Sequence, residues 1–178
     1  MRWVRDIAAR LPDDADVLEL GCGRGVPATR ELAKRHNVTG VDVSRAQLEL
    51  ARHHVPEALY VHADMCRIEY DDSSFDGVVA LYSLGHLPPD DQRGMLRRVA
   101  RWLRPGGLFL VTVSARDDVE ERVEDDWLGA PMYMAHIPAE ETRTILRDSG
   151  LELVRDLVEP QVEHGQEVSF LWLLAARP

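Results

Sequence analysis

The sequence has only two cysteines, Cys22 and Cys66, among its 178 residues. Two thiols are too few for a disulfide scaffold or for a zinc site built from thiolates. No apolar run is long enough to cross a bilayer, and the first six residues, MRWVRD, lack the apolar core of a signal peptide. We therefore expect a cytoplasmic protein that is not a membrane protein.

The chain also has fewer basic residues than acidic residues. The chain carries 21 Lys and Arg residues against 31 Asp and Glu residues, a formal net charge of −10. Because a negative surface repels phosphate backbones, we expect no nucleic-acid partner. A small molecule is the expected partner, and both a monomer and a homodimer remain open. The length favours a single domain over residues 1–178.

Strand-like and helix-like segments alternate along the first two thirds of the chain, which predicts an α/β fold with a mainly parallel sheet. The last two strands, at 151–158 and 168–176, follow a helix at 138–149 and have no helix between them, so they must form an antiparallel hairpin. The expected fold is thus one doubly wound, seven-stranded sheet. The other expected strands cover residues 16–20, 38–43, 59–62, 75–82 and 108–113, and the other expected helices cover 2–10, 26–35, 44–53 and 90–103.

A glycine-rich turn follows the first strand in the segment VLELGCGRG, residues 17–25. Glycine can adopt positive φ and lets a ligand approach the backbone, and the next helix directs its unpaired N–H groups to the same place. These features predict a site for a nucleoside-type cofactor. A dinucleotide site is the nearest alternative, but its pattern requires a glycine or another small residue where this chain has Val26.

Polar residues follow the next strands, at the edge where ligands bind in such sheets. Asp42 ends the second strand 21 residues after Gly21, a spacing that suits a carboxylate binding ribose hydroxyls. Asp64 follows the third strand and could hold the amine of an adenine. Tyr82 and His86 follow the fourth strand and complete the predicted edge.

Five motifs in this order resemble those of the class I S-adenosylmethionine-dependent methyltransferases, in particular short bacterial enzymes that act on small molecules. They are VLELGCGRG at 17–25, GVDVS at 40–44, ADM at 63–65, FDGVV at 75–79 and LRPGGL at 103–108. The resemblance implies a Rossmann-like methyltransferase fold. It also implies S-adenosyl-L-methionine as cofactor and S-adenosyl-L-homocysteine as product.

The same resemblance implies which residues bind the cofactor. The glycine loop would pass under the methionine part, with Glu19 helping to hold that end. Asp42 would bind the ribose, Asp64 and the Met65 backbone would hold adenine, and the Leu81 backbone would meet the methionine amine. The full implied set is Glu19, Gly21, Cys22, Gly23, Gly25, Asp42, Val43, Gln47, Asp64, Met65, Leu81 and Tyr82.

Methyl transfer from a sulfonium needs mainly positioning and desolvation, but an oxygen acceptor also needs a base that takes its proton. Histidine suits that task near neutral pH. His86 and His136 are the candidate bases, and His164 is a third histidine at the active edge that could take the same role; all three are also expected to contact the substrate. His86 could instead cap a helix or pack against the cofactor. An amine acceptor would need no base, so N-methylation is the alternative to O-methylation.

Residues 115–137 show no clear period and are expected to form a loop that covers the substrate, since long loops in compact domains are usually functional. Trp127 and Tyr133 in this loop suit a flat or apolar substrate, although they could simply cover the sheet. Trp3, at the open end of the first helix, is expected at the rim of the same site.

Two absences at the end of the fourth strand narrow the reaction. The segment ALYS, residues 80–83, lacks the Asn/Asp-Pro-Pro-Tyr pattern of methyltransferases that act on nucleic-acid amines. It also lacks the aspartate that begins the magnesium site of catechol-type enzymes, so we expect no metal. An aminopropyl transferase or a cyclase on the same cofactor site, and a non-catalytic cofactor-binding module, remain alternatives.

Overall fold

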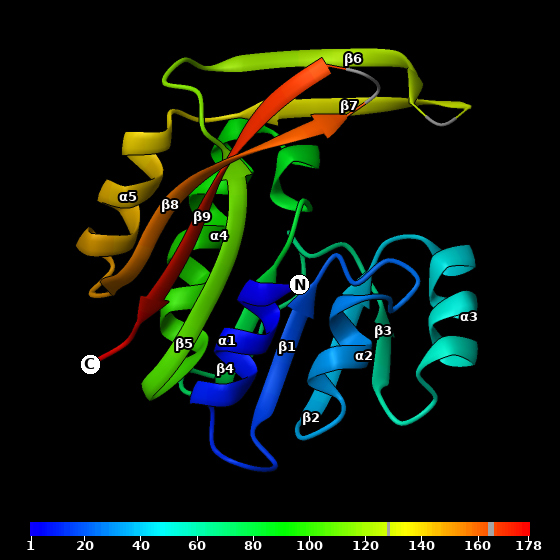
Figure 1. Ribbon diagram of the computed structural model, residues 1–178, viewed down its shortest axis with the longest axis vertical. Coiled ribbons are helices and arrows are strands. Elements are labelled where there is room, and N and C mark those ends of the chain that lie inside the picture. The colour runs from blue at the N-terminus through cyan, green and yellow to red at the C-terminus, as the bar shows by residue number, and fades with distance from the viewer. Residues whose placement is uncertain (128, 164–165) are drawn as a thin grey trace.

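A computed structural model describes residues 1–127, 129–163 and 166–178. Seven strands form one sheet in the order β3-β2-β1-β4-β5-β9-β8, with helices on both faces (Figure 1). The strands of this sheet are β1 (Asp16–Leu20), β2 (Asn37–Asp42), β3 (Leu59–His62), β4 (Phe75–Ala80), β5 (Leu103–Ser114), β8 (Glu152–Glu163) and β9 (Gln166–Ala176). The helices are α1 (Arg2–Arg10), α2 (Ala28–Leu32), α3 (Arg45–His54), α4 (Pro89–Trp102) and α5 (Ala139–Asp148), with a short 3-10 helix η1 (Leu84–His86).

The strand directions confirm the predicted topology. Strands β1 to β5 run parallel to one another, and β9 is antiparallel to both β5 and β8. The closing pair is therefore a hairpin in which only β9 runs against the rest of the sheet. Such a sheet places the carboxyl ends of β1, β2 and β4 along one edge, where the predicted site residues lie.

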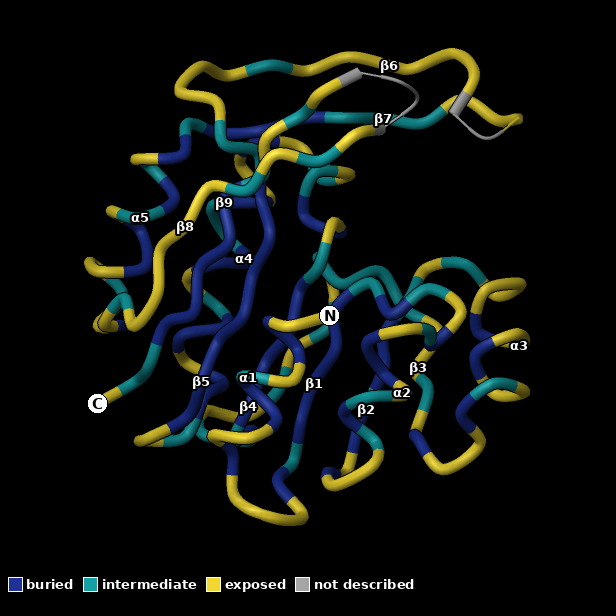
Figure 2. The backbone as a smooth tube through the Cα atoms, viewed as in Figure 1, coloured by how far each residue is buried: buried dark blue, intermediate teal, exposed yellow. Residues whose placement is uncertain are grey.

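The core explains why these segments become strands. The apolar runs in β1 and β4 are buried on both faces, as expected for central parallel strands, and Figure 2 shows β1, β4 and β5 as the most buried part of the sheet. One face packs against α4 and α5 through residues such as Leu96 and Leu146. The other face packs against α1 and α2 through residues such as Ile7 and Leu32. The loops at the carboxyl edge thus stand on a rigid base.

The prediction of a loop at 115–137 is wrong. This segment forms β6 (Glu120–Trp127) and β7 (Ala130–His136), an antiparallel pair that makes a second, two-stranded sheet. The pair lies across the carboxyl edge of the main sheet (Figure 1). Strand β6 reads EERVEDDW, and its charged, exposed side chains hide the alternation of apolar and polar residues by which a strand is normally recognised.

Three other boundaries differ from the expectation. The helix expected at 26–35 is shorter, because Pro27 is the N-cap of α2 and turns replace its last residues. The strand expected at 108–113 begins earlier, at Leu103, so residues 104–107 belong to β5 and lie beside a register shift against β4. Strand β8 continues through Pro160, which an edge strand tolerates because a proline without an N–H can face solvent there. Within the described residues, no helix is long and apolar enough to span a membrane.

Candidate functional site

The glycine loop after β1 has the backbone that its sequence predicts. Gly21, Gly23 and Gly25 have φ of 73°, 53° and 76°, a region that disfavours other residues. A Cβ on Gly21 would collide with the Cβ of Ser83, whereas a Cβ on Gly23 would meet no atom of the described residues within 4 Å. Gly21 therefore allows close packing against the end of β4, and Gly23 leaves its backbone open to a ligand.

Gly21→Ala is expected to destabilise the protein by about 3 kcal/mol, because it adds both an unfavourable positive φ and a steric overlap. Gly23→Ala is the matched control: its φ is also positive but its Cβ meets open space, so about 1 kcal/mol is expected. Urea unfolding of both variants measures the difference. Equal losses in the two variants would show that the contact with Ser83 does not matter.

Asp42 is anchored between the glycine loop and α3. Its Oδ2 accepts a hydrogen bond from the N–H of Gly23 at 2.8 Å, and its Oδ1 accepts one from the N–H of Ser44 at 2.8 Å. Ser44 in turn caps α3, since its Oγ accepts from the N–H of Gln47 at 3.4 Å. Each carboxylate oxygen keeps a further lone pair, so the group can still accept hydrogen bonds from a diol.

Glu19 lies beneath the same loop and is 4% exposed. The hydroxyl of Thr29 donates to its Oε2 at 2.6 Å. Burial, together with the nearby charge of Asp42, raises the pKa of Glu19 to about 7, against a smaller lowering by Thr29. The carboxyl can therefore gain or lose a proton near neutral pH, and a cation beside it would favour the charged form. Cys22, also in this loop, is a buried thiol whose pKa is raised by burial, which fits a small turn residue.

Asp64 and Met65 lie beside the glycine loop. The Oδ1 of Asp64 accepts from the N–H of Cys66 at 2.9 Å, and its Oδ2 lies 3.4 Å from Nε of Arg67. The Met65 methyl group lies 3.5 Å from the position a Cβ on Gly21 would take. The segments that follow β1 and β3 therefore come together at this edge of the sheet, although β2 lies between the two strands.

The remaining implied cofactor residues lie around this loop. Val43 and Gln47 are exposed at the start of α3, and Leu81 is half-buried after β4. Tyr82 is 40% exposed and has φ of 55°, a conformation that a residue with a large side chain adopts only when its surroundings impose it. Its hydroxyl accepts a hydrogen bond from Nε2 of Gln161 at 2.6 Å. Gln161 was missed because it falls in a segment expected to be a connection.

His86 ends η1 and lies against β7. Its Nδ1 is 3.1 Å from the backbone carbonyl oxygen of Tyr133. Because a carbonyl oxygen only accepts hydrogen bonds, Nδ1 must carry the proton, and Nε2 of a neutral ring then carries the lone pair. This arrangement gives His86 the tautomer that a general base needs.

His136 is the last residue of β7, and it is buried. Its Nε2 lies 3.1 Å from Oδ1 of Asp118, and Asp118 also pairs with Arg116 at 2.7 Å. Hydrogen bonds from Arg116 and then His136 hold the pKa of Asp118 well below its usual range. His136 is thus tied to the segment that leads into β6, and its partner Asp118 is not shared with His86, which bonds to the Tyr133 carbonyl oxygen.

Residues 17–107, about half of the chain, match the sequence profile of a family described as a methyltransferase domain. The chain belongs to the class I S-adenosylmethionine-dependent methyltransferases. The resemblance inferred from the five motifs is therefore confirmed.

Two relatives show the similarity in sequence. The 27-O-demethylrifamycin SV methyltransferase of Amycolatopsis mediterranei is 35% identical over 150 residues, which cover 76% of this chain and 53% of that protein. The O-methyltransferase resE of Aspergillus sclerotiorum is 32% identical over 180 residues, covering 89% of this chain and 66% of that protein. The chain therefore spans about half to two thirds of the length of these two relatives.

The fold of this methyltransferase is also found in a solved structure. A SAM-dependent methyltransferase of Methanosarcina mazei superposes with a TM-score of 0.81 at 19% identity, over 97% of this chain and 96% of that chain. At this identity the likeness concerns the fold, and it supports the predicted Rossmann-like architecture.

The other residues predicted to contact the methyl acceptor are Tyr133, Trp3, Trp127 and His164, and the structure describes the side chains of the first two. The hydroxyl of Tyr133 donates to Oε2 of Glu121 at 2.6 Å, and partial burial together with this bond raises the pKa of Tyr133 to about 12. Trp3 is 3% exposed and stacks on Trp172 at 5.4 Å between ring centroids, so its predicted position at an open rim is wrong. The sequence could not show that a ring from β9 covers it. The side chain of Trp127 and all of His164 lie outside the described residues.

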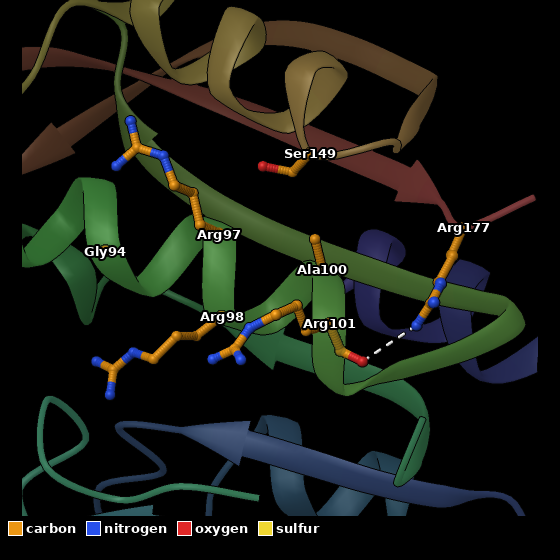
Figure 3. Close-up of a pocket in the computed structure, with 7 residues that line it drawn as sticks. All are labelled: Gly94, Arg97, Arg98, Ala100, Arg101, Ser149 and Arg177. Carbon is orange, nitrogen blue, oxygen red and sulfur yellow. Dashed lines mark hydrogen bonds between the residues drawn. The ribbon is translucent and has the colours of Figure 1, made fainter. Parts of the chain in front are cut away.

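A cavity of about 500 Å³ lies on α4, and Figure 3 shows the side chains around it. Its lining comes from Gly94, Arg97, Arg98, Ala100, Arg101, Ser149 and Arg177. None of these is among the predicted site residues of the methyltransferase, and the guanidinium groups of Arg97 and Arg98 point apart (Figure 3). The candidate site is therefore the carboxyl edge of the sheet and not this cavity.

Proposed function

We propose that the protein transfers a methyl group from S-adenosylmethionine to an oxygen atom of a small-molecule acceptor. The observation that carries this proposal is the open backbone of Gly23 beside the anchored carboxylate of Asp42. This pair fits a cofactor that has a ribose diol and a chain passing over a glycine loop. One of the two relatives described above is named an O-methyltransferase, and the other is named for a substrate that lacks an O-methyl group, 27-O-demethylrifamycin SV; both names support oxygen as the acceptor atom.

When bound, S-adenosylmethionine supplies a methyl group on a cationic sulfur, and it leaves as S-adenosylhomocysteine once that methyl has moved to the acceptor. In this proposal Asp42 binds the ribose hydroxyls and Asp64 holds the adenine amine, with Met65 beside the ring. Glu19 attracts the charged methionine end from below the loop. Gly21, Cys22, Gly23, Gly25, Val43, Gln47, Leu81 and Tyr82 form the remaining cofactor contacts.

His86 is the proposed base. Its Nε2 would accept the proton of the acceptor hydroxyl, and the Tyr133 carbonyl oxygen would hold the ring and stabilise the charge that then develops on it. His136 is bonded to Asp118 and buried, so we propose that it holds the base of the β6–β7 hairpin and the start of α5 in place. Its role as a second base stays a prediction.

The β6–β7 hairpin takes the covering role that was expected of a loop. It lies across the carboxyl edge (Figure 1), and its Tyr133 contacts the ring of His86 through a backbone oxygen. A cover in this position would exclude water from the acceptor and strengthen electrostatic interactions inside the site. We propose that residues 1–178 form one domain that carries both the cofactor site and this cover.

The affinity for S-adenosylmethionine is expected to rise with pH through neutrality. The ionised form of Glu19 attracts the cationic cofactor, and because burial raises its pKa to about 7, the attractive form is lost as pH falls through that value. Binding at pH 6 should be about tenfold weaker than at pH 8. Calorimetry with Glu19→Gln supplies the control, since this variant should bind weakly and equally at both values. An identical pH dependence in wild type and Glu19→Gln would exclude Glu19 as the cause.

The proposed reaction is tested with S-adenosylmethionine carrying a trideuteromethyl group and a library of small hydroxyl and amine compounds. We expect release of S-adenosylhomocysteine and an acceptor that gains the labelled methyl on oxygen, identified by mass spectrometry and NMR. Labelling on nitrogen alone would replace the oxygen proposal by N-methylation. Cofactor binding without transfer to any compound of the library would favour a non-catalytic binding module.

A further inference from the structure

Arg98 extends from α4 to the segment 63–70, which follows β3 and carries Asp64 and Met65. Its Nη1 donates to the backbone carbonyl oxygens of Cys66 at 2.9 Å and Ile68 at 3.2 Å, and its Nη2 donates to that of Met65 at 3.5 Å. One guanidinium group therefore holds three carbonyl groups of a segment that has no helix or strand of its own after His62.

The side chain of Arg98 is itself fixed. It is only 16% exposed, its Cζ lies 5.7 Å from the ring centroid of Trp102, and its Nη2 contacts the sulfur of Met95 at 2.6 Å. Met95 and Trp102 are fully buried parts of α4. Arg98 also pairs with the exposed carboxylate of Glu69 at 3.4 Å, but its contacts with Met95 and Trp102 connect the held segment to the core.

The contacts continue from Arg98 to the proposed cofactor residue. Cys66 accepts from Arg98 through its carbonyl oxygen and donates through its own N–H to Oδ1 of Asp64 at 2.9 Å. The next backbone contact also closes this turn, since the N–H of Arg67 donates to the carbonyl oxygen of Asp64 at 3.0 Å. Arg98 therefore fixes the backbone turn that aims the carboxylate of Asp64.

We infer that Arg98 is a positioning residue for recognition of the adenine base of the cofactor. This inference rests on the proposed function, because it takes Asp64 and Met65 as the adenine contacts. A held segment presents its carboxylate and backbone without an entropy cost on binding, whereas a loose segment must be ordered by the ligand. Arg98 should therefore raise the affinity for the base and leave the acceptor side and the methyl transfer itself unchanged.

The test uses Arg98→Met, which keeps an apolar stem against Trp102 but cannot donate to the three carbonyl groups. Arg98→Lys keeps the charge but has no fork of donors. Arg97→Met is the matched control, because Arg97 is the neighbouring residue on α4, is exposed, and points away from Arg98 (Figure 3). All three variants remove or change one cation on the same helix.

Calorimetry measures binding of S-adenosylhomocysteine and of S-inosylhomocysteine, which has hypoxanthine in place of adenine. In wild type the adenine compound should bind more tightly. In Arg98→Met its affinity should fall about tenfold, and the preference for adenine over hypoxanthine should shrink toward one. The KM for S-adenosylmethionine should rise by a similar factor while kcat and the KM for the acceptor stay unchanged, and Arg97→Met should match wild type throughout.

An unchanged preference for adenine in folded Arg98→Met and Arg98→Lys would overturn the inference alone. Loss of cooperative unfolding in both variants would also overturn it, by making Arg98 a requirement for folding. Wild type that binds neither compound would instead contradict the proposed function, and the inference would fall with it.

Discussion

Replacement of Asp42 by alanine is expected to weaken binding of S-adenosylmethionine by about a hundredfold. In the proposed complex this carboxylate accepts two charge-assisted hydrogen bonds from the ribose, and each such bond contributes about 1.5 kcal/mol or more. The substitution also leaves the N–H of Gly23 and the N–H of Ser44 without their acceptor, so the loop loses part of its order. Calorimetry at pH 8, where Glu19 is mostly ionised, measures the effect.

Two variants separate the role of the carboxylate from its charge. Asp42→Asn keeps the shape and one acceptor oxygen, and an intermediate loss is expected. Glu49→Ala removes an exposed negative charge from α3, the helix that follows Asp42 in the chain. This variant should bind the cofactor as wild type does. If Asp42→Ala bound S-adenosylmethionine with unchanged affinity, Asp42 could not be the ribose ligand.

His86→Ala is expected to reduce kcat by about a hundredfold to ten-thousandfold for an oxygen acceptor, which is the usual contribution of a general base. The ring is held by the Tyr133 carbonyl oxygen in the tautomer with its lone pair on Nε2, so its loss removes the proton acceptor without removing a cofactor contact. Steady-state kinetics with an acceptor found in the library assay, together with calorimetry for the cofactor, measure the two effects separately.

His136→Ala tests whether a second histidine also acts as a base or only supports the hairpin. His136 is buried against Asp118, so its removal should lower stability and act on turnover only through the hairpin. His62, whose Nε2 contacts the Val43 carbonyl oxygen away from β7, offers a histidine outside the proposed acceptor side, and His62→Ala should keep kcat. Full turnover in His86→Ala and His136→Ala, with normal cofactor binding, would show that no histidine of this pair acts as base.

The parts of the fold that could be predicted from the sequence are those with local causes. Apolar runs such as Val78–Leu81 mark buried strands, and the glycines at 21, 23 and 25 mark a turn that needs positive φ. Strand ends then place Asp42 and Asp64 at one edge, because all parallel strands of a sheet end on the same side. These features need no knowledge of distant contacts.

The parts that could not be predicted depend on residues far apart in the chain. The tautomer of His86 is set by a carbonyl group on β7, and the hydroxyl of Tyr82 is met by Gln161 on β8. The burial of Trp3 depends on Trp172, a residue of β9 near the other end of the sequence. Strand β6 was missed for a different reason, since its charges conceal the alternation that marks a strand. The residues on the acceptor side of the site are therefore harder to predict from the sequence than those on the cofactor side.

The β6–β7 hairpin is the structural feature that the sequence concealed and that matters most for the acceptor. The Tyr133 carbonyl oxygen of β7 contacts Nδ1 of His86, and the Ala135 carbonyl oxygen accepts a hydrogen bond from Nε2 of Gln92 on α4 at 3.0 Å. The hairpin is thus attached to both η1 and α4, and the residue that we propose as base contacts it directly. The choice of acceptor should accordingly depend on β7 more than on the glycine loop.

In this proposal the glycine loop and the anchored Asp42 together bind S-adenosylmethionine. Titration of the wild-type protein with S-adenosylmethionine in a calorimeter tests it most directly. We predict saturable binding of one cofactor molecule per chain, with an affinity that Asp42→Ala reduces about a hundredfold. Absence of any binding heat or saturation at about 1 mM cofactor would contradict the account.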